Sequence, residues 1–317
     1  MRLYLRSRSR GSTRLTSLLA QHVSTLQSIP LEIAGWDPVF VDLRIPSAHH
    51  MLMESPYRDL WRELDEVEIM RRFVRAGDVV FDIGANIGLH SIVLSRFIGS
   101  SGRLHAFEPN AELLPALTHT IGQLGNATLH AVALSNKNAE SSLFVPPDDS
   151  VASLADWTAL SPKFKEDGPA HVVDCRERRL GDLIRSEDLP QPDFIKCDVE
   201  GAELQVFQGA CETLDRINAP VILFEANECA SRAFNLEVSA AKDFLSALVK
   251  PRYRFFEITA GGKLANLQEI NSSFLNILAV PRSKLGYWPE LAELGPQESV
   301  PEGVWPGTAR LQRKMQG

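Results

Sequence analysis

The sequence predicts a doubly wound α/β fold, in which helices cover both faces of a seven-stranded, mostly parallel sheet, with an N-terminal extension. Three observations predict this fold. Short apolar runs, typical of buried parallel strands, alternate with segments of helical periodicity between residues 61 and 285. A glycine-rich turn directly follows the first of these runs. The chain of 317 residues is 44% hydrophobic, which is enough to bury a large core.

The first half of this core is expected to contain three strands. A helix over 61–75 should end near Gly77, just before the first strand. Apolar residues then recur at helical spacing between the strands, as in Leu89, Ile92 and Val93. This alternation is the sequence form of a parallel sheet with crossover helices. The expected strands are 79–81, 104–107 and 127–134, and the expected helices between them are 89–98 and 111–121.

The second half begins with an interruption. Residues 136–176 contain Ser-rich and Pro-rich pieces and two strand-like runs, so they are interpreted as an insertion at the sheet edge or over the site. The alternation then resumes, and the last two apolar runs lack a crossover helix, which favours an antiparallel pair. The expected helices are 180–184, 202–215 and 237–249, and the expected strands are 140–145, 170–175, 193–197, 221–224, 253–258 and 274–280.

The two ends of the chain differ from this core domain of residues 61–285. Residues 1–30 contain five arginines and no Asp, Glu or Lys. We interpret residues 1–60 as an N-terminal extension with a partly disordered basic tail. A transit peptide and a segment that touches anionic lipid are the alternatives. Residues 286–317 lack periodicity and are interpreted as a C-terminal extension.

Composition disfavours several functional classes. The formal net charge of −7 argues against a nucleic-acid partner. No window of 18 apolar residues occurs, so no membrane span is expected. The four cysteines form no CxxC pair, so we expect no metal site, and their small number suits a reducing compartment, here predicted to be the cytoplasm.

The turn over residues 82–88, which reads D-I-G-A-N-I-G, is the main functional signal. Gly84 and Gly88 lack side chains, so the backbone can approach a ligand closely. The helix after the turn offers free N–H groups to a carboxylate. Asp82 is placed to attract a cationic amine, and Asn86 can hydrogen-bond the same ligand. The turn therefore predicts a site for an amino acid group.

Glu108 ends the second strand, twenty residues beyond Gly88. An acid at this position can accept hydrogen bonds from both ribose hydroxyls of a nucleoside. Dinucleotide-binding domains use the same acid, but their turn reads G-x-G-x-x-G and cradles a pyrophosphate. Here the turn begins with an acid, which repels a pyrophosphate and attracts a cation. A nucleoside with a cationic amino acid group is favoured, and a purely structural glycine turn is the alternative.

Two motifs resemble those of a known family. Residues 81–88 resemble the first motif of class I methyltransferases. Residues 193–203, which read D-F-I-K-C-D-V-E-G-A-E, resemble the I-K-x-D-x-E-G-x-E signature of the FkbM methyltransferase family. The resemblance covers about residues 65–281 and implies a Rossmann-like class I fold with S-adenosylmethionine as cofactor. It also implies O-methylation of a hydroxyl on a sugar, a glycan, or a glycosylated or polyketide-type natural product.

The resemblance also implies which residues bind the donor. The first motif and the acid after the second strand match the family's donor-binding positions, and their neighbours complete the predicted site. The insertion 136–176 and residues 1–60 have no clear counterpart, so the acceptor is not identified. The predicted cofactor-binding residues are Asp82, Gly84, Ala85, Asn86, Gly88, Glu108, Pro109 and Ser135.

The acceptor side is expected at the end of the fourth parallel strand. Alternation along an extended chain puts Lys196, Asp198 and Glu200 on one side. Repulsion between two carboxylates raises the proton affinity of one, which suits a general base. We predict Asp198 nearest the methyl group, Glu200 as base or acceptor-binding group, and Glu225 as a further ligand of the acceptor hydroxyl. An ion-paired cluster that only shapes the loop is the alternative. His90 directly follows the glycine turn and is interpreted as an exposed helix-face residue, with a role as a base as the alternative.

Two other functions stay open. A non-catalytic module that keeps the fold and binds a partner is disfavoured by the intact Asp82, glycines and Glu108. An N-methyltransferase site often carries an N/D-P-P-Y/F turn after the fourth strand, whereas residues 198–201 read D-V-E-G. The favoured partner is therefore a small-molecule or glycan acceptor.

Overall fold

The computed structural model describes residues 12–33, 35–45, 48, 65–146, 151–157, 160 and 169–294. The first eleven residues of the predicted basic tail, nearly all of residues 46–64 and residues 295–317 lie outside the described part. The predictions of a disordered tail and of an aperiodic C-terminal end therefore stay predictions for those segments.

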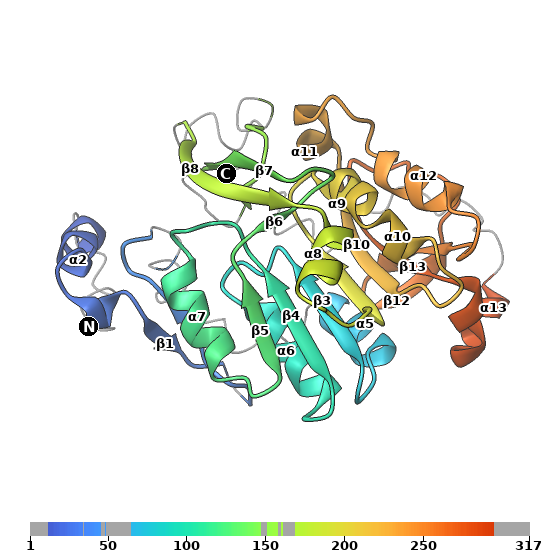
Figure 1. The fold of residues 1–317 in the computed structure, drawn as a ribbon, viewed down its shortest axis with the longest axis horizontal. Coiled ribbons are helices and arrows are strands. Elements are labelled where there is room, and N and C mark those ends of the chain that lie inside the picture. Colours follow the sequence, from blue (N-terminus) through green and yellow to red (C-terminus); the bar gives the residue numbers. More distant parts are fainter. Residues whose placement is uncertain are drawn as a thin grey trace.

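A single large sheet forms the centre of the molecule (Figure 1). Its strand order is β12-β11-β13-β10-β9-β3-β4-β5, and the five strands from β10 to β5 run parallel. This confirms the doubly wound α/β fold and the antiparallel placement of β11 and β13. The strands are β3 (Val79–Ile83), β4 (Arg103–Phe107), β5 (Ala127–His130), β9 (Phe194–Cys197), β10 (Val221–Asn227), β11 (Arg254–Thr259), β12 (Lys263–Asn266) and β13 (Phe274–Val280).

The sheet has eight strands rather than the predicted seven. The additional strand, β12, pairs with β11 across a turn that contains Gly261 and Gly262, both at positive φ. β12 is an edge strand of four residues that is exposed or half-buried throughout, so it carries no apolar run that a sequence pattern would reveal.

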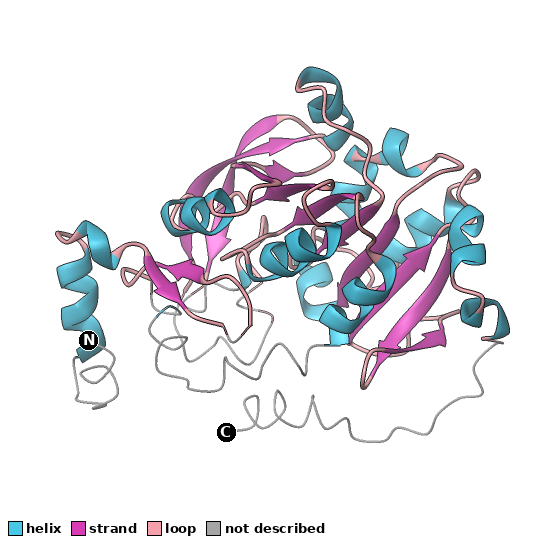
Figure 2. Ribbon diagram, turned by 90° about the horizontal axis from the view of Figure 1, so that it is seen from below, coloured by secondary structure: helices cyan, strands magenta, loops and turns pink. Residues whose placement is uncertain are grey.

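Helices cover both faces of the sheet, as the cyan ribbons on either side of the strands in Figure 2 show. α5, α6 and α7 bury their apolar sides in one core, and α8, α9, α10 and α12 bury theirs in the other. The predicted helix over 202–215 is broken at Ala210 into α9 and α10. The helices are α5 (Asp65–Phe73), α6 (Leu89–Ile98), α7 (Leu114–Gly122), α8 (Leu180–Ser186), α9 (Glu203–Gly209), α10 (Cys211–Leu214), α11 (Glu228–Ala233) and α12 (Ala240–Ala247).

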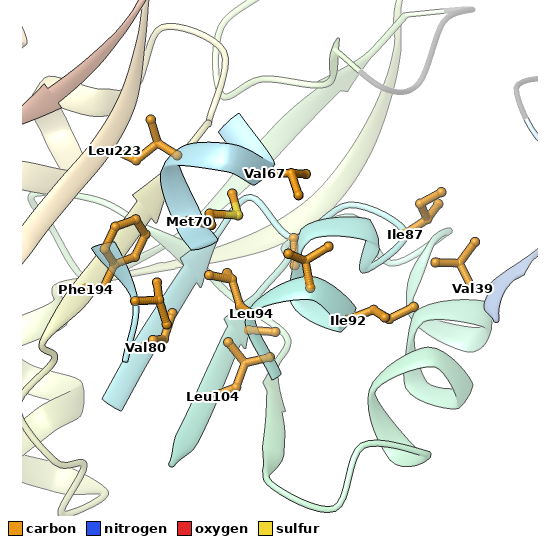
Figure 3. Packing of buried hydrophobic residues seen from close by; sticks show 14 of the residues in the cluster. Val39, Val67, Met70, Val80, Ile87, Ile92, Leu94, Leu104, Phe194 and Leu223 are labelled. Carbon is orange, nitrogen blue, oxygen red and sulfur yellow. The ribbon is translucent and has the colours of Figure 1, made fainter. Parts of the chain in front are cut away.

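The core beneath α5 and α6 fixes the strands that bear the site (Figure 3). Met70 of α5 and Leu94 of α6 pack with Val80, Leu104 and Phe194, all fully buried. Full burial of such a side chain stabilises the fold by roughly 1.5–3 kcal/mol. Since side chains alternate along a strand, the residues two positions further on, toward the carboxyl ends, lie on the same face of the sheet.

The predicted insertion forms a separate three-stranded sheet, with the order β6-β8-β7. Its two long strands coincide with the two strand-like runs that the sequence predicts. The predicted strand over 127–134 is wrong in extent, because β5 ends at His130 and the chain then leaves the main sheet to pair with β8. The strands of this sheet are β6 (Ala133–Leu134), β7 (Ala139–Val145) and β8 (His171–Arg178).

The region before α5 is more regular than predicted. After α2 (Ser12–Ala20) and the short 3-10 helix η1 (Ser24–Leu26), two strands form an antiparallel hairpin beside α7. The Phe40 N–H donates to Thr120 Oγ1 of α7 at 2.9 Å. The prolines in this region favour irregular structure, so the sequence did not predict these two strands. They are β1 (Ile29–Leu31) and β2 (Val39–Val41).

The chain beyond residue 285 also packs on the core. It forms a 3-10 helix, η4 (Arg282–Tyr287), and a short helix, α13 (Glu290–Glu293). The Trp288 ring lies 4.5 Å from the Phe73 ring, and Trp288 Nε1 donates to the Arg72 carbonyl oxygen. The first residues of the predicted C-terminal extension therefore belong to the domain. Among the described helices, none combines the length and the apolar character that a membrane span requires.

Candidate active site

Polar side chains follow one another across the main sheet at the carboxyl ends of its parallel strands. In the register of the sheet, Asp82 of β3 is the partner of Lys196 of β9, and Leu223 of β10 is the partner of Lys196 on the other side. Asp198 and Glu225, each two residues further on, are therefore adjacent on the same face. Loops at this edge and the insertion enclose a cavity of about 250 Å³.

The glycine turn forms one wall of this cavity. The N–H groups of Gly84 and Ala85 both donate to the Phe107 carbonyl oxygen at 3.0 Å, which ties the turn to β4. Gly84 has φ +79°, and a Cβ there would lie 1.8 Å from the Asp198 carbonyl oxygen. Glycine is thus required at this position for close packing of β3 against the chain after β9, in addition to the predicted access for a ligand.

Glu108 lies at the cavity wall and is 6% exposed. Its two carboxylate oxygens accept hydrogen bonds from the backbone N–H groups of Asn86 and Asn110, each at 2.8 Å. Burial raises the pKa of Glu108 to about 7, although these two hydrogen bonds favour the charged form. The carboxylate is therefore held in one orientation at the end of β4.

Asp82 lies behind the cavity wall rather than on it. The side chain is fully buried, and Oδ2 accepts a hydrogen bond of 2.6 Å from Ser91 Oγ of α6. Burial raises the pKa of Asp82, and the nearby Lys196 opposes that shift. Asp82 anchors α6 and is not part of the cavity lining, so this arrangement offers a donor amine no direct contact with it.

Lys196 connects the two sides of the cavity. Its Nζ lies 3.1 Å from Asp198 Oδ2 and 3.8 Å from Asp82 Oδ1, and it donates to the Gly84 carbonyl oxygen at 3.2 Å. Burial alone would lower the pKa of Lys196, but the two carboxylates outweigh it and raise that pKa. Lys196 is thus a permanent cation that lines the cavity with its charge already compensated.

The two glutamates predicted on the acceptor side have different positions. Glu200 lines the cavity at φ +52°, and Ser153 Oγ of the insertion donates to its carbonyl oxygen at 2.7 Å. Glu225 is not part of the cavity lining and instead borders a smaller hollow beside α9 and α12. Burial, and then the negative charges of Glu200 and Asp198, raise the pKa of Glu225 well above its usual range.

The structure gathers most of the predicted site residues around one cavity but leaves four outside its lining. Besides Asp82 and Glu225, Gly88 faces α7, where a Cβ would meet Thr120 Cγ2 at 2.7 Å. Ser135 is buried and donates its N–H to the Arg178 carbonyl oxygen, away from the cavity. The predicted residues that line the cavity are Gly84, Ala85, Asn86, Glu108, Pro109, Lys196, Asp198 and Glu200.

Sequence reasoning misplaced one polar residue near this site and missed two others. His90 lines the cavity with a buried Nε2, so its interpretation as an exposed helix-face residue is wrong. Glu66 of α5 accepts a hydrogen bond from Asn276 of β13, the partner of Glu225 in the sheet register. Burial, and then the charge of Asp198, raise the pKa of Glu66. Glu66 and Asn276 are distant in sequence, and they approach this site because β13 lies beside β10 in the sheet.

The insertion supplies the opposite wall. Leu143 of β7 and residues 152–154 line the cavity together with residues 132–134. Phe144 and Ser153 exchange backbone hydrogen bonds, which hold the 152–154 segment against β7. The cavity thus has apolar lining from this part of the chain and polar lining from the strand ends, a combination that suits a ligand with one apolar end and one charged end.

Comparisons with known proteins point to one family. A family model described as the methyltransferase FkbM domain matches residues 82–255, more than half of the chain. Hexuronic acid methyltransferase AglP of Haloferax volcanii is 28% identical over 171 residues, which are 53% of this chain and 65% of that protein. The 2-O-methyltransferase NoeI of Sinorhizobium fredii is 28% identical over 163 residues, 47% of this chain and 64% of that protein.

The matches thus span less than two thirds of these two relatives. Among solved structures, a methyltransferase FkbM from Methylobacillus flagellatus KT aligns with a TM-score of 0.43 and 15% identity. That alignment covers 87% of this chain and 61% of the other.

Proposed function

The chain belongs to the FkbM methyltransferase family, and from this premise we propose that it transfers a methyl group from S-adenosylmethionine to a hydroxyl group of a sugar or of a glycosylated small molecule. One observation carries the proposal. A carboxylate suited to ribose, Glu108, and two carboxylates suited to an acceptor, Asp198 and Glu200, line a single cavity.

The residues present fit the donor. Glu108 is held by backbone N–H groups at the end of β4, where a carboxylate can accept hydrogen bonds from ribose hydroxyls. Leu134, Leu143 and Leu154 offer apolar surface for a base. Asp198 and Glu200 line the same cavity beside Lys196, and acidic side chains there favour a sulfonium cation. When bound, the donor supplies an activated methyl group.

The chemistry left to this chain is positioning and proton transfer. The acceptor oxygen must approach the methyl carbon in line with the breaking carbon–sulfur bond. A sugar hydroxyl is a poor nucleophile near neutral pH, so a side chain must accept its proton as the new bond forms. We assign this role to Glu200, with Asp198 orienting the hydroxyl, because both line the cavity while Lys196 is already ion-paired with Asp198.

Two considerations support a sugar hydroxyl as the acceptor. AglP is named for a hexuronic acid and NoeI for 2-O-methylation. Three of the four charged residues that line the described cavity are acidic, namely Glu108, Asp198 and Glu200. An anionic acceptor would therefore meet repulsion at this wall, which favours a neutral sugar hydroxyl here and distinguishes the proposed acceptor from the carboxylate-bearing hexuronic acid for which AglP is named.

We also propose a reducing compartment such as the cytoplasm. All four cysteines are free thiols, and Cys175 and Cys197 are buried. Unpaired, buried cysteines without a disulfide framework suit a compartment that keeps thiols reduced.

Transfer of a labelled methyl group tests the function. The full chain is incubated with methyl-labelled S-adenosylmethionine and a panel of neutral sugars, uronic acids, amines and a fractionated glycan extract. We expect label on a hydroxyl oxygen of a neutral sugar residue, identified by mass spectrometry. Label on nitrogen would contradict O-methylation. Donor binding without transfer to any fraction would favour a non-catalytic module.

A further inference from the structure

Phe274, the first residue of β13, is an aromatic side chain that the proposed chemistry does not use. It is 43% exposed and lies where the parallel strands of the main sheet have their carboxyl ends, because β13 runs antiparallel to β10. A single exposed apolar side chain is common on protein surfaces. Phe274 is notable for the polar side chains that share its face of the sheet.

Phe274 and three polar residues of β10 and β13 share this face. In the antiparallel register, Asn227 is the partner of Phe274, and Glu225 is the partner of Asn276. Side chains alternate along a strand, so these residues lie on one face, and the Cβ atoms of directly opposite residues are about 5 Å apart. The three polar side chains are half-buried, and the ring is exposed. We call this group the β10–β13 patch.

Hydrogen bonds hold the polar side chains of the β10–β13 patch. Asn227 Nδ2 donates to Glu225 Oε1 at 3.1 Å, and Asn227 Oδ1 accepts from the Ala230 N–H of α11 at 3.3 Å. Asn276 Nδ2 donates to Glu66 Oε1 of α5. The side-chain Oε2 of Glu225 and Oδ1 of Asn276 make no hydrogen bond within the described part of the chain. The patch therefore offers a ligand fixed hydrogen-bond acceptors beside an exposed ring.

The β10–β13 patch continues the acceptor side of the cavity. Asp198 lines the cavity just after β9, and β10 lies between β9 and β13 in the sheet. Two strand spacings, about 10 Å, therefore separate β13 from β9. This separation is comparable with the length of a disaccharide. After burial, the charge of Asp198 is among the causes that raise the pKa of Glu66 and, with Glu200, that of Glu225, which indicates that both acids lie near the cavity.

We propose that the β10–β13 patch is a second sugar subsite, in which the Phe274 ring stacks on the sugar residue next to the methylated one, so that the acceptor contains at least two sugar residues. The inference rests on the sugar acceptor of the proposed function. A sugar ring presents C–H groups on its faces and hydroxyl groups at its rim. An aromatic ring covers the C–H groups, and carboxylate and amide oxygens accept hydrogen bonds from the hydroxyls.

The test uses the size of the acceptor and two variants of the full chain. A glycan extract is fractionated by size, each fraction is incubated with methyl-labelled S-adenosylmethionine, and the labelled products are identified by mass spectrometry. KM and kcat are then measured for the labelled acceptor and for the single sugar that corresponds to its methylated residue. The variants are Phe274→Ala and Phe274→Trp. Tyr287→Ala, which removes an exposed ring of η4, is the control, and thermal unfolding confirms that all three variants are folded.

We expect label on acceptors of two or more sugar residues. Phe274→Ala should raise KM for such an acceptor by about fivefold and leave kcat within about twofold, because the lost contact is equal in the ground state and the transition state. Phe274→Trp should retain the low KM, since it keeps an aromatic face. Neither variant should change KM for the single sugar or the affinity for S-adenosylmethionine, and Tyr287→Ala should change none of these quantities.

Three results would overturn the proposal and leave the sugar hydroxyl as the methylated group. They are a preference for the single sugar, an unchanged KM in Phe274→Ala, and an equal rise in KM for the single sugar and the longer acceptor. Label on no sugar fraction would instead show that the proposed function itself is wrong, a result distinct from a failure at Phe274.

Discussion

Glu108 at the end of β4 accepts a hydrogen bond from the backbone N–H of Asn86 at 2.8 Å, so a carboxylate joins the glycine turn to the neighbouring strand. The same carboxylate also accepts a hydrogen bond from the Asn110 N–H. These two bonds fix the orientation of the carboxylate in the absence of a ligand. The protonation state of Glu108 can still change with pH.

Donor affinity should depend on pH through Glu108. Burial raises the pKa of Glu108 to about 7, so the acid takes up a proton as the pH falls below that value. Because ribose hydroxyls need a charged acceptor, S-adenosylmethionine affinity should fall about tenfold between pH 8 and pH 6. Calorimetry in buffers of different ionisation enthalpy measures the affinity and the accompanying proton release.

Glu108→Gln should remove this pH dependence and weaken donor binding at pH 8 by at least about tenfold. Glu112→Gln is a matched control, since Glu112 is exposed and pairs with His171 outside the cavity. Unchanged affinity in Glu108→Gln would show that the acid does not hold the ribose.

Glu200 should affect turnover rather than donor binding. Glu200→Gln keeps the size of the side chain but cannot accept the acceptor proton, so turnover should fall by about a hundredfold or more. The affinity for S-adenosylmethionine should stay within about twofold, because the donor is held elsewhere in the cavity. Single-turnover transfer with labelled donor measures the first quantity and calorimetry the second. Glu228→Gln, at an exposed ion pair with Arg232, serves as the control.

The close approach of the Gly84 backbone to the Asp198 carbonyl oxygen should make the free energy of unfolding sensitive to a side chain at position 84. Gly84→Ala places a Cβ 1.8 Å from the Asp198 carbonyl oxygen at a residue with φ +79°. Because both the strand end and the turn would have to move, the free energy of unfolding should fall by at least about 2 kcal/mol. Urea denaturation measures this change.

Gly122→Ala provides the matched control for that substitution. Gly122 lies in α7, and a Cβ added there would meet no described atom within 4 Å outside its own stretch of helix. Alanine in a helix should therefore raise the free energy of unfolding, by about 0.5–1 kcal/mol. A similar loss of stability in both variants would show that the contact with Asp198 is not the cause.

Trp288 should be needed for the stability of the domain. It is 8% exposed, packs on Phe73 and donates to the Arg72 carbonyl oxygen. Trp288→Ala should lower the free energy of unfolding by about 3–5 kcal/mol. Tyr287→Ala, at a neighbour that is 59% exposed, should cost far less. If the two substitutions had equal effects, the segment after residue 285 would not be part of the cooperative core.

The sequence was sufficient for elements with strong local signals. The apolar run 79–81 predicts β3, which extends to Ile83, and the run 104–107 predicts β4, with Glu108 directly after it. Prediction from the sequence failed where tertiary contacts, rather than the local pattern, decide which strands pair. The chain after His130 leaves the main sheet because β8 offers a partner to residues 133–134, although the paired residues 177–178 come 44 positions later in sequence.

The parts of the candidate site that are close together in sequence could be predicted, and those that meet only through the fold could not. Lys196, Asp198 and Glu200 are close in sequence, and all three line the cavity. The predicted alternation along an extended chain is wrong for Glu200, because β9 ends at Cys197 and Glu200 has φ +52°. The burial of His90 depends on which strand lies beside α6, and the contact between Glu66 and Asn276 joins residues 210 positions apart. Helical periodicity predicts which residues of a helix face the sheet, but not which strand they contact. The sequence therefore predicts neither the burial of His90 nor the contact between Glu66 and Asn276.

The wall contributed by residues 132–154 follows from a single departure of the chain from the edge strand β5, and the chain returns through β8 just before α8. The described strands of that segment, β6 and β7, take no part in main-sheet pairing, and Lys196 keeps its register with Asp82 through β9 and β3. Changes of length or composition within it would reshape this wall of the cavity while leaving the pairing of β3, β4 and β9 in place. The architecture thus allows new acceptors to be acquired without rebuilding the machinery that holds the methyl donor.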